Sequence, residues 1–146
     1  MDIIKKILIA TFILIAVCST SFADEGMVAI GEDFQGTLYA VMTDTVRQNK
    51  FYVSGEYLVL PQNRDLVNIL IEDSNNPKAV ASVIVMAYTH DFKYRQIIEM
   101  RIIDSEFNKL DYQKYTFDEK NYEIIKNNTI AYDIAMKVKE VIKKKK

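Results

Sequence analysis

The chain has 146 residues, of which 49% are hydrophobic and 27% charged, and its formal net charge is −1. This composition is typical of one globular domain, and it excludes a wholly disordered or collagen-like chain. A single Cys and a single His exclude a zinc site with several Cys and His ligands and a framework of several disulfides. Since no global positive charge attracts phosphates, we expect no nucleic-acid partner.

The first 23 residues have the pattern of a secretory signal peptide. Two lysines precede an unbroken apolar run, Ile7 to Val17, and Ser21 and Ala23 place small side chains just before a cut after Ala23. We therefore expect an exported protein, located in the periplasm, at the cell surface or outside the cell. It would contact the membrane only through this segment, before cleavage.

Two alternatives to this cleavage stay open. The apolar run could anchor the chain, although a bilayer span needs about 20 apolar residues. Lipidation at Cys18 could replace the cut after Ala23, although Val17 stands where lipoprotein cleavage favours a small residue. With the cut after Ala23, residues 24–146 form a single domain that contains no cysteine, and hence neither a disulfide nor a thiol nucleophile.

Charge is unevenly distributed after the predicted cut. Residues 24–136 carry −7 and residues 137–146 carry +5. The lysines of the Lys-rich end 143–146, among them Lys143 and Lys144, suit the negative end of a helix dipole. They also suit contact with an anionic envelope polymer or lipid headgroup, and both interpretations stay open.

The body of the chain is predicted to form short strands separated by turns. Apolar and polar residues alternate with a period of two, for example along 51–60, where Gly55 marks a bulge or a close approach of another element. Val80 to Tyr88 is almost wholly apolar, which predicts a central strand. Leu66 to Ile71 fits a short strand or a helical turn. The other expected strands are 27–30, 37–43, 94–103 and 110–117.

The period changes to that of a helix near the C-terminus. Ile130, Ile134, Val138 and Val141 recur at intervals of four, four and three residues, which forms one apolar stripe. Residues 127–129 supply an N-cap candidate, and the stripe needs a sheet face to pack against. We therefore predict an α+β fold: an antiparallel sheet of about five or six strands with one C-terminal helix packed on one face.

Several short motifs follow one another in a familiar order. The first half contains Val28-Ala29-Ile30-Gly31, Leu38-Tyr39, Asp44-Thr45-Val46 and the alternating strand from Phe51. The second half contains strands at 95–103 and 110–117, Tyr122, a turn at 127–129 and the final helix. This order resembles the surface-adhesin protein E-like family of small exported bacterial proteins, over roughly residues 27–141. The resemblance implies an antiparallel sheet with a C-terminal helix and an envelope or surface role, which in the best-known relative is binding of host matrix proteins.

Candidate catalytic groups are few. His90-Asp91 is the one place where a carboxylate could orient a general base, but no G-x-S-x-G string supplies a nucleophile. Glu72-Asp73 and Asp118-Glu119 lie beside turns, without the dense acidic loop of a calcium site. No glycine-rich loop is present to hold a phosphate. We therefore expect no enzyme, no catalytic residue, no metal and no cofactor.

Tyrosine is the residue type in excess, with nine copies. Its apolar ring and polar hydroxyl suit both strand margins and binding interfaces. The expected partner-binding residues are Tyr52, Tyr112, Lys143 and Lys144, with the tyrosines on the sheet face that the helix leaves open. The main expectation is a non-enzymatic, adhesin-like binding module for a protein or an envelope polymer, with homodimerisation through the same face. The alternative is an envelope or periplasmic carrier of a small apolar ligand, held between helix and sheet.

Overall fold

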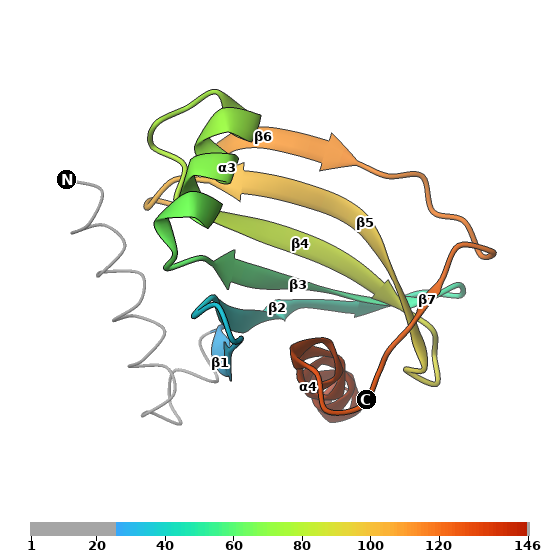
Figure 1. The fold of residues 1–146 in the computed structure, drawn as a ribbon. Helices are drawn as coiled ribbons and strands as arrows, with labels where there is room; N and C mark the ends of the chain where they lie inside the picture. The colour runs from blue at the N-terminus through green and yellow to red at the C-terminus, as the bar shows by residue number, and fades with distance from the viewer. Residues whose placement is uncertain (1–25, 146) are drawn as a thin grey trace.

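The structure, a computed structural model, describes residues 26–145, and these form one antiparallel sheet and two helices (Figure 1). The helices are α3 (Arg64–Ser74) and α4 (Ile130–Lys144). Six strands pair in sequence order, and the two-residue β7 pairs with the start of β5. The predicted α+β fold is confirmed. The strands are β1 (Val28–Glu32), β2 (Leu38–Gln48), β3 (Val53–Leu60), β4 (Ala81–Tyr88), β5 (Tyr94–Ile103), β6 (Lys109–Lys114) and β7 (Glu123–Ile124).

The signal-peptide interpretation concerns residues 1–23, including Cys18, and these lie outside the described residues. Between residues 26 and 145, no helix is long and apolar enough to cross a membrane.

The C-terminal helix forms and packs as predicted. Thr129 is its N-cap, because its Oγ1 accepts a hydrogen bond from the Tyr132 N–H at 3.1 Å. The apolar stripe buries Ile134 and Val138 against β1, β2 and β3. Gly55 of β3 permits this contact, since a Cβ atom at this position would lie only 3.3 Å from a Val138 methyl carbon. The predicted close approach at Gly55 is therefore confirmed.

A second helix lies between β3 and β4 and includes the ambiguous segment Leu66–Ile71. Asn63 caps its first turn by accepting a hydrogen bond from the Asp65 N–H at 2.8 Å. Asn75 ends it in the left-handed conformation, with φ of 50°. In Figure 1, α3 lies across one end of the strands and contacts β4 and β6. Of the two interpretations of this segment, the helical one is correct. The structure therefore has α3 in addition to the predicted C-terminal helix α4.

Apolar side chains are buried on both faces of the sheet. One cluster joins α4 to the sheet through Tyr57 and Val138 among others. The other cluster lies on the opposite face and includes Leu58 and Val83, which are 0% and 2% exposed. The expectation of an open second face therefore holds over only part of its area. The open part lies at the end of the sheet where β3 begins and β6 ends.

Candidate functional site: an aromatic groove on the sheet

The cross-strand register places one row of side chains on the sheet face opposite α4. Glu56 of β3 pairs with Val85 of β4, Val85 pairs with Glu99 of β5, and Glu99 pairs with Lys114 of β6. Residues directly opposite one another in antiparallel strands point to the same face, so these four side chains form one row across four strands. Tyr112, two residues before Lys114 in β6, shares this face.

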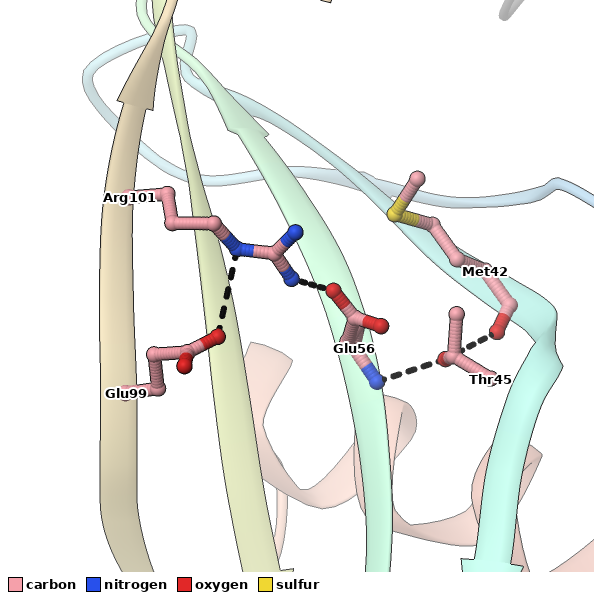
Figure 2. Close-up of polar contacts among 5 residues, drawn as sticks. All are labelled: Met42, Thr45, Glu56, Glu99 and Arg101. Carbon is pink, nitrogen blue, oxygen red and sulfur yellow. Dashed lines mark hydrogen bonds and ion pairs between the residues drawn. The ribbon is translucent and has the colours of Figure 1, made fainter. Parts of the chain in front are cut away.

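Arg101 of β5 connects two carboxylates on this face, with α4 visible behind the strands (Figure 2). Its guanidinium forms an ion pair with Glu56, and its Nε lies 3.3 Å from a carboxylate oxygen of Glu99. Thr45 extends the network, since its Oγ1 accepts a hydrogen bond from the Glu56 N–H at 2.9 Å and donates one to the Met42 carbonyl oxygen at 2.6 Å. The three charged side chains are 21 to 28% exposed. At that exposure, the ion pairs fix the pattern of charge more than they stabilise the fold.

Beside this network the sheet face is hollowed into an open groove of about 610 Å³. The rings of Tyr52 and Phe117 pack there with their centroids 4.7 Å apart. Phe117 also meets the ring of Tyr122 edge-on at 6.0 Å. Segments more than sixty residues apart thus form one aromatic surface. We call it the aromatic groove, and its lining includes Tyr52, Val85, Glu99, Lys114, Tyr115 and Phe117.

One wall of the groove is the segment 115–122, which leaves the sheet before the predicted strand end at Phe117. Gln96 of β5 holds this segment in place. Its Nε2 donates hydrogen bonds to the carbonyl oxygens of Asp118 and Asn121, at 2.7 and 3.1 Å, and its Oε1 accepts one from the Asp118 N–H at 2.9 Å. Gln96 is 7% exposed, so water competes little for these three bonds. The groove therefore has a fixed wall.

Both tyrosines predicted to bind a partner lie on the groove face. Tyr52 lines the groove itself. Tyr112 is 44% exposed, and the Lys109 ammonium lies 4.6 Å from its ring centroid. Desolvation and a hydrogen bond to Glu99 raise the pKa of the Tyr112 hydroxyl. Since Glu99 also lines the groove, Tyr112 lies next to the groove rather than in its lining.

The two lysines predicted to bind a partner lie elsewhere, in the last turn of α4. Lys143 is exposed, and the Nζ of Lys144 lies 3.2 Å from a carboxylate oxygen of Glu140. The adjacent Lys145 donates a hydrogen bond to the Val46 carbonyl oxygen at 2.9 Å. Part of the lysine-rich end is therefore engaged within the fold.

His90 and Asp91 do not form a catalytic pair. The Nε2 of His90 lies 3.1 Å from the Asn49 carbonyl oxygen. The Asp91 carboxylate accepts hydrogen bonds from the Thr89 hydroxyl at 2.7 Å and the Lys93 N–H at 3.0 Å, and these bonds lower its pKa. In the part of the chain that the structure describes, no group of three His, Cys, Asp or Glu side chains could hold a metal ion.

A second hollow, of about 280 Å³, lies between α3 and the sheet. The Asp33 carboxylate at its edge accepts a hydrogen bond from the Tyr39 hydroxyl at 2.9 Å. Burial and this bond raise the pKa of Tyr39 to about 12. The volume falls at the lower limit for small-molecule sites, and the hollow lies beneath α3 rather than α4. Its lining includes Tyr39, Val59, Leu66, Ile69, Leu70 and Ser82.

No family model, no curated protein and no solved structure matches this chain. Function is therefore inferred from the geometry of the described residues.

Three residues that shape the groove were not predicted from the sequence: Gln96, Glu99 and Arg101. Alternation assigns Glu99 and Arg101 to one face of β5, but it does not identify the residues opposite them on β3 and β6. For Gln96, the available signal was an uncharged amide just before the apolar pair Ile97-Ile98. A buried amide needs hydrogen-bond partners, and these lie more than twenty residues further along the chain.

Proposed function

We propose that this protein is a non-enzymatic binding module, exported and adhesin-like, that holds its partner in the aromatic groove. The observation that carries the proposal is the meeting of Tyr52, Tyr115 and Phe117 on an open part of a rigid sheet. Aromatic side chains that are partly exposed on a fixed scaffold are frequent anchors of binding interfaces. The partner is a protein or an envelope polymer.

Binding to surfaces coated with bacterial envelope polymers or with purified host matrix proteins tests this proposal. We expect Tyr52→Ala and Phe117→Ala to weaken binding, because each removes one of two packed rings. Tyr94→Ala is the matched control, since Tyr94 is 41% exposed and does not line the groove. Equal binding by the groove variants and the wild-type protein would contradict the proposal.

Two further measurements test the role of the lysine-rich end and the expected homodimer. A chain lacking Lys143 to Lys146 should bind as the full chain does if the groove alone holds the partner. Sedimentation of the chain alone measures homodimerisation. A dimer that Tyr112→Ala dissociates would make a second copy the partner at this face.

The hollow under α3 supports a second candidate function, transport of a small apolar ligand. Val59, Leu66 and Leu70 form an aliphatic part of its lining, and Ile69 is 50% exposed. A fluorescent dye that binds apolar hollows, such as anilinonaphthalene sulfonate, should bind the chain and lose affinity on Ile69→Asp. Dye binding unaffected by Ile69→Asp would remove this candidate.

A further inference from the structure

Lys114 lines the aromatic groove and has no ion-pair partner within residues 26–145. Its register partner Glu99 is engaged by Arg101 and Tyr112. Within residues 26–145, no carboxylate lies within ion-pair distance of the Lys114 ammonium, although Lys114 is exposed and lines the groove. The groove therefore presents one free cation beside its aromatic rings, and a ligand that carries an anionic group complements it.

The backbone under the groove is already paired, and the outer edge of β6, which has no partner strand among the described residues, would place an added peptide strand beside the sheet rather than on the groove face. Glu99 and Lys114 belong to paired strands, and the Tyr115 N–H donates a hydrogen bond to the Ile98 carbonyl oxygen at 3.0 Å. A peptide that extends a sheet needs free N–H and C=O groups at a strand edge.

The charged network also limits what the face can hold. Glu56, Arg101 and Glu99 form a charged row from β3 to β5 (Figure 2). Since Glu99 also lines the groove, the apolar surface ends at this row. An amphipathic helix needs an apolar stripe several turns long, and this surface is too short for one.

Sugar rings, which are flat and rich in hydroxyl groups, fit this short surface of aromatic rings better than a peptide strand or an amphipathic helix does. The C–H face of a pyranose packs well on an aromatic ring. Tyr52, Tyr115 and Thr116 are all part of the lining, and each carries a hydroxyl group that can both donate a hydrogen bond to a sugar hydroxyl and accept one from it. We propose that the partner is a polysaccharide with carboxylate groups, whose sugar rings stack in the groove while one carboxylate pairs with Lys114. This inference rests on the proposed function of the groove and names its ligand class.

Calorimetric titration of the full chain with oligogalacturonate tests the inference. We expect binding that weakens as salt rises, and loss of about tenfold in affinity on Lys114→Gln, the effect of one charge-assisted hydrogen bond. Lys114→Arg should restore most of the affinity. Lys78→Gln, a change at an exposed lysine of the α3–β4 connection, is the control and should change nothing.

Two further ligands distinguish the outcomes. A fully methyl-esterified oligomer of the same length should bind more weakly, and equal binding would overturn the carboxylate assignment while leaving the groove as the binding surface. Equal or tighter binding of poly-glutamate would identify an acidic peptide instead. Failure of oligogalacturonate to bind would overturn the ligand class. Oligogalacturonate binding that Tyr115→Ala leaves intact would overturn the groove itself, and with it the proposed function.

Discussion

At the scale of single residues, Gln96 controls the shape of the groove. Its buried amide pairs with the backbone N–H and C=O of Asp118 and with the backbone C=O of Asn121. Gln96→Leu keeps the apolar volume but leaves these backbone groups without partners. We expect the free energy of unfolding in urea to fall by about 1–3 kcal/mol.

Amide hydrogen exchange at Asp118 provides a local check on the same variant, because its N–H loses its acceptor. The matched control is Gln113→Leu, since Gln113 is exposed on β6. Similar losses of stability in both variants would show that Gln96 does not hold the segment 115–122.

Tyr122 presents the opposite case, a polar atom without a hydrogen-bond partner between residues 26 and 145. Its hydroxyl is buried and has no hydrogen-bond partner among the described residues. Tyr122→Phe removes the unpaired hydroxyl and keeps the ring against Phe117. We therefore expect unfolding free energy in urea to stay the same or rise by up to about 1 kcal/mol.

Tyr39→Phe serves as the comparison for Tyr122→Phe. The Tyr39 hydroxyl donates to Asp33 at 2.9 Å, so its removal should lower stability. A clear loss of stability in Tyr122→Phe would show that this hydroxyl forms a hydrogen bond in solution.

At the scale of elements, the contact between β3 and α4 depends on Gly55, which has no side chain. A Cβ atom at Gly55 would lie 3.3 Å from a Val138 methyl and 3.4 Å from a Val46 methyl. Gly55→Val therefore pushes α4 away from the sheet, and we expect a loss of about 1–3 kcal/mol in urea unfolding.

A double-mutant cycle isolates this contact. Val138→Ala alone also destabilises, because it leaves a cavity, but together with Gly55→Val it should cost less than the two changes added. Additive losses would mean that the valine at position 55 disturbs something other than α4.

The two helices differ in how far the sequence predicts them. The stripe of α4 extends over three turns and follows a capping residue, so period and cap agree. The apolar part of α3 is six residues long, and its caps, Asn63 and Asn75, lie in clusters that equally fit turns.

The residues of the groove were harder to predict from the sequence than either helix. Tyr52 and Tyr112 could be chosen as exposed aromatics, but Phe117 meets Tyr52 only because segment 115–122 continues alongside β5 beyond the end of β6.

At the scale of the whole molecule, buried tyrosines set an alkaline limit on stability. Burial raises the pKa of Tyr57 to about 12, against about 10 in an unfolded chain, and it also raises the pKa of Tyr88. Because the folded-state pKa is the higher one, the stabilisation is complete below about pH 10 and is lost as pH rises towards 12.

Urea unfolding across this pH range measures the effect. We expect the wild-type protein to lose about 2–3 kcal/mol from the Tyr57 shift between about pH 10 and pH 12. Tyr57→Phe should flatten this fall, whereas Tyr94→Phe, a change at an exposed ring, should not. A curve for Tyr57→Phe as steep as that of the wild type would exclude Tyr57 as the titrating group.

The order of the elements has a consequence during synthesis, because α4 follows every strand of the sheet along the chain. A ribosome releases β1, β2 and β3 long before it releases the 15 residues of α4 that cover them. Until then Val41 and Tyr57 lack their cover, and the nascent chain cannot complete its native core. A chain whose core stays open until α4 emerges can be held by a chaperone or threaded through a narrow channel. A premature stop codon before Ile130 would yield a product that quality-control proteases degrade.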